Sequence, residues 1–99
     1  MLIPPVVRIS GHDIQVEVKE YVLDGKQEAC SGMAYLLQDR IDIADKWNGV
    51  NVSDDAKGET FIHEVIHHID SKYYIGLKEQ QVEKLGSGMY AFLRDNLLK

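Results

Sequence analysis

Two histidines, His63 and His67, lie four positions apart in a segment whose apolar residues recur at the spacing of an α-helix. Residues i and i+4 of a helix lie one turn apart on the same face. The segment is therefore expected to fold as an amphipathic helix, with its apolar face on a core and both histidines on another face. The apolar positions are Phe61, Ile62, Val65, Ile66 and Ile69. His68, a quarter-turn from His67, is expected to face solvent or to pack locally.

The histidine pair and the glutamate beside it have the spacing of a metal site. In His63-Glu64-Val65-Ile66-His67, two imidazole nitrogens on one helix face can reach a single ion at roughly 2.0–2.1 Å, the usual Zn–N distance. Glu64 then lies next to a zinc-bound water and can act as its general base. A solvated or hydrogen-bonded histidine pair without metal is the alternative. We favour the zinc site, because the surrounding helix pattern leaves the histidines off the core face.

A catalytic zinc site needs a third protein ligand and one open position for water. Glu79 and Glu83 lie one turn apart in the next predicted helix, so both can face the same site. Asp70 lies three positions after His67, on the metal-facing side of the first helix. From spacing alone, Glu79 and Glu83 both remain candidates for the third ligand. Asp70 is either a further ligand, a carboxylate that supports a zinc-bound residue, or a residue of the helix end, and the last two roles are favoured over the first.

Length and composition indicate one small domain, residues 1–99. A hydrophobic fraction of 44% with 27% charged residues is typical of a soluble globular chain. The net charge of −5 and the absence of a Lys/Arg cluster argue against a partner that is nucleic acid or an anionic membrane. No signal peptide or membrane-span pattern is recognisable, and Cys30 is the single cysteine. These features predict a cytoplasmic protein, and they leave its oligomeric state open.

Hydrophobic patterning predicts an α+β fold, with a small antiparallel sheet of about four strands followed by two packed helices. The expected strands cover residues 6–9, 14–18, 33–37 and 40–44. Residues 21–31 are expected to be irregular and residues 45–52 to form a loop.

The first helix is expected to run from a cap among Ser53, Asp54 and Asp55 to about Lys72, with Gly76 closing it. The second is expected over residues 78–97, with its apolar stripe on the first helix. Gly86 and Gly88 lie inside the second helix, where glycine lowers helix stability. Either a close approach to a neighbouring element or a bend would account for them.

The order of these features resembles the gluzincin metallopeptidases. In that group a "glutamate helix" after the motif helix gives the third ligand, as the run Glu79-Gln80-Gln81-Val82-Glu83 after His67 and Gly76 would here. More narrowly, the chain is similar to the small phage- and prophage-encoded zinc metallopeptidases related to the ImmA/IrrE group. This similarity covers roughly residues 32–97, including Glu59-Thr60-Phe61-Ile62-His63 and the ending at residues 89–96.

The resemblance implies residue roles that spacing alone leaves open. Glu79 would be the third zinc ligand, and Glu83 would brace a zinc-bound histidine. The chain departs from larger gluzincins, because only eleven residues separate His67 from Glu79. That short connection keeps Glu83 as an alternative ligand.

The resemblance also implies a zinc-dependent metallopeptidase that hydrolyses a protein or peptide substrate, with a zinc-activated water and Glu64 as general base. In zincins an edge strand pairs with the extended substrate, here residues 33–37 or 40–44. ImmA/IrrE relatives cleave or regulate repressor-type transcription factors. The developing oxyanion needs a donor besides zinc, commonly a Tyr, His or Arg side chain. Tyr73, Tyr74 and Tyr90 are candidates, each with a core or rim position as the alternative, and the sequence does not choose among them.

Two other classes of function stay open at this point. One is a zinc-containing protein-binding module of phage origin with little turnover. The other is a structural zinc domain, in which protein, for example Asp70, fills the fourth coordination position.

Overall fold

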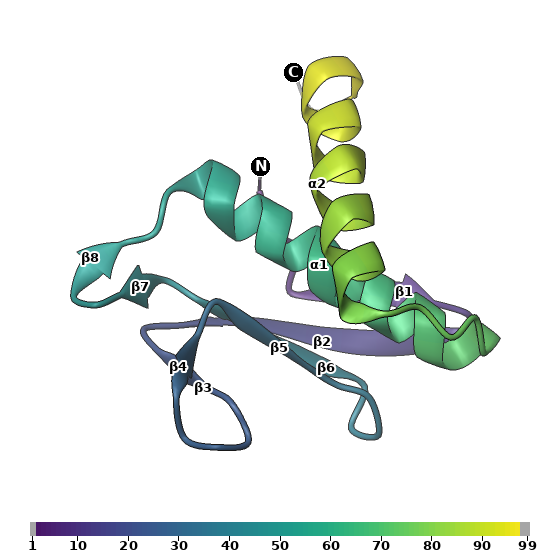
Figure 1. Cartoon of the computed structure of the whole chain (residues 1–99), viewed down its shortest axis with the longest axis horizontal. Helices are drawn as coiled ribbons and strands as arrows, with labels where there is room; N and C mark the ends of the chain where they lie inside the picture. The colour runs from purple at the N-terminus through teal and green to yellow at the C-terminus, as the bar shows by residue number, and fades with distance from the viewer. Residues whose placement is uncertain (1, 98–99) are drawn as a thin grey trace.

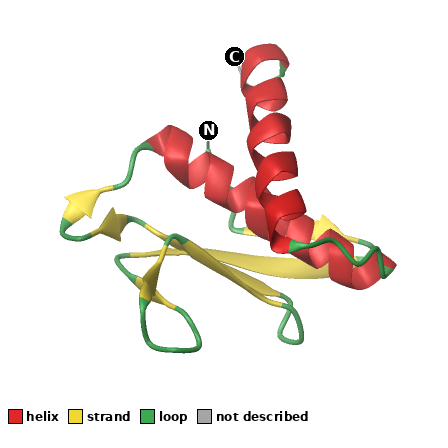
Figure 2. Cartoon of the chain, in the orientation of Figure 1, coloured by secondary structure: helices red, strands yellow, loops and turns green. Residues whose placement is uncertain are grey.

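The computed structural model describes residues 2–97, which form a four-stranded sheet followed by two helices (Figure 1). The strands in spatial order are β1 (Val6–Ile9), β2 (His12–Lys19), β6 (Arg40–Ala44) and β5 (Gly32–Tyr35). Figure 2 shows the strands in yellow and the helices in red, and the colours of Figure 1 show that the strands come before the helices along the chain. The predicted α+β class, with a four-stranded sheet and two packed helices, is confirmed.

The sheet is mixed, which corrects the expectation that every strand pair is antiparallel. β1–β2 and β5–β6 are antiparallel, but β2 and β6 run parallel, with Val16 opposite Ile41. The reason is that β5 takes the outer edge, so that its hairpin partner β6 returns between β5 and β2. Burial of alternate residues, as in β2 at Ile14 and Val16, is the same whichever way a neighbouring strand runs. The pattern therefore could not distinguish the two arrangements.

Two short strand pairs occupy segments predicted to be irregular or loop. β3 (Val22–Leu23) pairs with β4 (Ala29–Cys30), and β7 (Lys46–Trp47) pairs with β8 (Val50–Asn51). Asn48 and Gly49 join the second pair with φ angles of 50° and 79°, a conformation typical of a two-residue hairpin turn. Strands of two residues are too short to give a sequence periodicity.

The two predicted helices have ends close to those expected. α1 (Asp54–Tyr73) begins after Ser53, whose hydroxyl oxygen accepts a hydrogen bond from the backbone N–H of Ala56 at 3.1 Å. Tyr74, with a φ of 53°, takes the left-handed position at the end of α1 that was expected of Gly76, which corrects that expectation. Gly76, with a φ of 82°, lies in the turn before α2 (Glu79–Asn96). Within residues 2–97, neither helix combines the length and the hydropathy that a membrane span requires.

α1 covers one face of the sheet, and the core lies between them (Figure 1). The buried side chains come from the strands and from the predicted apolar face of α1, with a smaller share from α2. They include Ile9, Ile14, Val16, Ile41, Ile43, Phe61, Ile62, Ile66, Val82 and Tyr90. Because this face of α1 is committed to the core, the histidine face is left beside the sheet edge and α2.

α2 crosses α1, and its C-terminal half projects away from the sheet (Figure 1). Gly86 lies at the crossing, where a Cβ atom would be 3.4 Å from Cα of His63. Gly88 faces open space, since no described atom lies within 4 Å of a Cβ built there. Close approach of the two helices therefore accounts for Gly86 and not for Gly88.

Candidate metal centre

The histidines of the motif lie on the expected face of α1. The side chains of His63 and His67 are 21% and 26% exposed, whereas Phe61 and Ile66 on the core face are almost fully buried. Their rings meet edge to face, with centroids 4.9 Å apart. The two imidazoles are thus accessible and close enough to share one ion.

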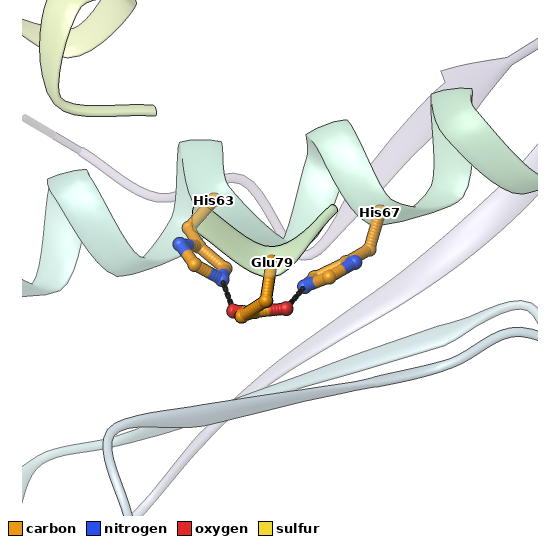
Figure 3. A group of neighbouring side chains, drawn as sticks. All are labelled: His63, His67 and Glu79. Carbon is orange, nitrogen blue, oxygen red and sulfur yellow. Dashed lines mark hydrogen bonds and ion pairs between the residues drawn. The ribbon is translucent and has the colours of Figure 1, made fainter. Parts of the chain in front are cut away.

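Glu79, the first residue of α2, lies between the two rings (Figure 3). Its Oε1 atom is 2.8 Å from Nε2 of His63, and its Oε2 atom is 3.1 Å from Nε2 of His67. One ligand atom from each of the three residues lies within 4.8 Å of the others. Two imidazole nitrogens and a carboxylate oxygen form a donor set that suits Zn²⁺ with an open fourth position.

Glu83 lies one turn further along α2 and lines the same pocket. It is outside the group formed by His63, His67 and Glu79. In the described part of the chain, no hydrogen bond joins Glu83 to either histidine. Of the two candidate glutamates, the fold brings Glu79 to the histidines, and the bracing role implied for Glu83 stays a prediction.

Asp70 serves the turn that leads into α2. Its Oδ1 atom accepts hydrogen bonds from the backbone N–H groups of Gly76 at 2.8 Å and Leu77 at 2.9 Å. The backbone N–H of Lys78 then donates to the Gln81 side chain at 2.8 Å, which fixes the start of α2. These bonds set the position of Glu79, so Asp70 acts at the helix end rather than within the His63–His67–Glu79 group.

Glu64 is 7% exposed and faces the same pocket from α1. Burial, with a further contribution from the negative charge of Glu79, raises the pKa of Glu64 to about 7. A carboxyl group that exchanges its proton near neutral pH suits a general base that must later act as an acid.

The pocket at the His63–His67–Glu79 group has a volume of about 660 Å³ and lies between the start of β5, α1 and the first half of α2. Four glutamates line it, whereas no lysine or arginine does, so its charge favours a cation. The lining residues are Ser31, Gly32, Met33, Ala56, Glu59, Thr60, His63, Glu64, His67, Glu79, Glu83 and Ser87.

Gly32 is a residue of this site that sequence reasoning missed. A Cβ atom there would be 2.6 Å from Cγ2 of Thr60 and 3.2 Å from Oε2 of Glu64. The absence of a side chain lets the β5 backbone approach the Glu64 carboxyl group closely. The sequence signal for this close approach was a glycine directly before the strand predicted over residues 33–37.

β5 is an edge strand, whereas β6 lies between β2 and β5. Of the two strands expected to pair with a substrate, only β5 therefore has an unpaired edge. Its first residues, Gly32 and Met33, also line the pocket.

The three tyrosines expected as oxyanion donors do not line this pocket. Tyr90 is buried, and its hydroxyl donates a hydrogen bond to Asp55 at 2.7 Å. Tyr73 and Tyr74, at the C-terminal end of α1, are 60% and 93% exposed. The expectation of a tyrosine donor here is therefore not supported by the geometry.

His68 is fully buried, so of the two positions expected for it, facing solvent is wrong and packing within the fold is correct. Its Nε2–H group donates a hydrogen bond to the backbone carbonyl of Arg40 at 3.0 Å. Burial lowers the pKa of His68. This histidine links α1 to β6 and takes no part in the pocket.

Comparison with protein-family models, with curated proteins and with solved structures gives no match to this chain. A functional assignment therefore rests on the geometry of the site.

Proposed function

We propose that this protein is a zinc-dependent metallopeptidase whose metal ligands are His63, His67 and Glu79. The observation that carries the proposal is the convergence of these three side chains, with ligand atoms within 4.8 Å of one another, although Glu79 comes from a different helix. The Glu79 side chain is exposed, so its position between the two imidazoles does not contribute to the hydrophobic core. A shared cation would account for this position.

The chemistry follows from the positions of the side chains. Zinc held there would supply a Lewis acid that activates water and polarises the scissile carbonyl. Glu64, buried at the same pocket, accepts the proton of the attacking water and passes it to the leaving amine. Burial and the negative charge of Glu79 raise the pKa of Glu64 to about 7 in the metal-free protein, and a bound cation would lower it toward the ionised form that accepts a proton.

The substrate we propose is an extended peptide segment of a protein. It would add to the free edge of β5 through backbone hydrogen bonds, which brings the peptide across the mouth of the pocket. The single cysteine is in keeping with action in a reducing compartment, and we propose the cytoplasm.

A second candidate function is a zinc-containing protein-binding module with little turnover. The observation that favours it is the absence of the candidate tyrosines from the pocket lining, which leaves the oxyanion without the expected side-chain donor. Substitution of Glu64 distinguishes the two functions, because a peptidase loses activity without its general base, whereas a binding module does not need one.

Elemental analysis of purified protein tests the metal site. We expect about one zinc per chain in the wild type and in Glu64→Gln, and loss of zinc in His67→Ala and Glu79→Ala. Glu83→Ala is the matched control, because it removes a glutamate of the same pocket that lies outside the ligand group. Loss of zinc in Glu83→Ala with retention in Glu79→Ala would move the third ligand, and a metal-free wild type would rule out the zinc site.

Hydrolysis of a peptide library then tests the activity. Cleavage by the zinc-loaded wild type that is lost in Glu64→Gln supports the peptidase. Peptide capture without cleavage in both proteins supports the binding module.

A further inference from the structure

α2 carries an apolar surface that the fold leaves uncovered. Leu85, Met89 and Phe92 are 45%, 45% and 59% exposed. They recur at i, i+4 and i+7, so they form one stripe along the helix, which we call the α2 stripe. A contiguous apolar stripe on a projecting helix is a feature of interaction surfaces.

A hollow of about 360 Å³ lies in the α2 stripe, above Gly88. It is lined by Lys84, Leu85, Gly88, Met89 and Phe92. No described atom lies within 4 Å of a Cβ built at Gly88. Packing within the described chain therefore does not require a glycine at this position. A glycine inside a helix is unfavourable unless something else requires the space.

We propose that the α2 stripe binds the same stripe of a second copy of this chain, with the two α2 helices antiparallel about a two-fold axis. Centred between Gly88 and Met89, such a pairing places Met89 of each copy opposite Gly88 of the other. It also places Leu85 of each copy opposite Phe92 of the other. The surface is then self-complementary, as an isologous dimer interface requires, with a large side chain facing the hollow.

The charges beside the α2 stripe fit the same pairing. Lys84 and Asp95 are eleven positions apart, about three helical turns, so they lie on one flank of the stripe. Antiparallel pairing about the same centre brings Lys84 of each copy alongside Asp95 of the other. In the described part of the chain Lys84 has no ion pair, and Asp95 pairs only with the neighbouring Arg94 at 3.1 Å.

Sedimentation equilibrium of the full chain over a range of concentrations tests this dimer. We expect a reversible monomer–dimer equilibrium in the wild type and a dissociation constant raised at least about tenfold in Met89→Glu. Gly88→Ala should weaken the dimer as well, because its methyl group fills the hollow. The same change should leave the monomer as stable as the wild type or more so, since alanine favours the helix. Leu37→Glu is the matched control, because Leu37 is 97% exposed on the turn after β5, away from α2.

A charge exchange tests the antiparallel register. Lys84→Asp and Asp95→Lys should each weaken the dimer, and the double variant should restore it. Within one helix these residues lie about three turns apart, so rescue has to come from the second copy. A wild type that stays monomeric at every concentration would overturn the proposal. A dimer that survives Met89→Glu and Gly88→Ala, is lost in Leu37→Glu, or is not rescued in the double variant would overturn it too.

Discussion

Gly86 of α2 lies directly against the backbone of His63 in α1, so that a Cβ atom at Gly86 would be 3.4 Å from Cα of His63. This contact sets how closely the helix that carries Glu79 approaches the helix that carries the histidines. The distance is that of an ordinary van der Waals contact, so the crossing can accept a methyl group and little more.

The first prediction concerns the size of the side chain at position 86. Gly86→Leu should force the helices apart, lower the free energy of unfolding by about 1–3 kcal/mol and weaken zinc binding, because Glu79 moves away from the imidazoles. Gly86→Ala is the control and should keep both properties close to those of the wild type. Urea unfolding and a competitive zinc titration measure the two effects. Equal zinc affinity in the leucine variant would show that the crossing does not position Glu79.

The second prediction concerns the approach of β5 to Glu64. In Gly32→Ala the new methyl group meets Cγ2 of Thr60 and Oε2 of Glu64, at 2.6 Å and 3.2 Å from the ideal Cβ position. We expect destabilisation of about 1–3 kcal/mol and a lower kcat, with zinc retained because no ligand is touched. Adding Thr60→Ser removes the closer methyl group and should recover part of the stability. No recovery in the double variant would place the strain elsewhere.

The helices were predictable because each carries a local signal that the structure uses directly. Ser53 caps α1, Phe61 and Ile66 recur on its core face, and the spacing of His63 and His67 sets both on one side. The position of Glu79 depends on the turn between the helices. Spacing alone left Glu79 and Glu83 as equal candidates, and the resemblance favoured Glu79, which is the glutamate that the fold brings to the histidines.

The remaining features depend on contacts between distant segments, which no local pattern encodes. The parallel pairing of β2 with β6 depends on which strand takes the edge, and Ile41 would be buried in either arrangement. Gly32 matters only because Thr60 and Glu64 pack against it. The local pattern did not decide between a solvent-facing and a packed His68. The structure buries it, with Nε2–H donating to the carbonyl of Arg40, whereas Nδ1 has no hydrogen-bond partner among the described residues.

The third prediction is a dependence of stability on pH that arises from His68. Burial lowers the pKa of His68 from its ordinary value of 6.5, so below about pH 6.5 the unfolded chain binds a proton there that the folded chain does not. The stability contributed by the neutral ring is fully present above that pH and is lost as the pH falls toward the lower folded pKa. Urea unfolding between pH 7.5 and 5 in the presence of a chelator should show a shallower decline in His68→Gln, on the order of that one proton. The other histidines are common to both proteins, so the difference in slope reports His68, and identical slopes would contradict the assignment.

The fourth prediction separates a turn role of Asp70 from a ligand role. Asp70→Ala removes the acceptor of two backbone hydrogen bonds, from Gly76 and Leu77, and should lower the free energy of unfolding by about 1–2 kcal/mol. It should also weaken zinc binding, because the turn that positions Glu79 is loosened. Asp70→Asn keeps the Oδ1 acceptor, so it should bind zinc and unfold almost as the wild type does. A carboxylate ligand, by contrast, would lose most of its affinity on conversion to an amide. Zinc titration of the two variants side by side therefore decides the role, and loss of zinc in Asp70→Asn with an unchanged unfolding midpoint would make Asp70 a ligand.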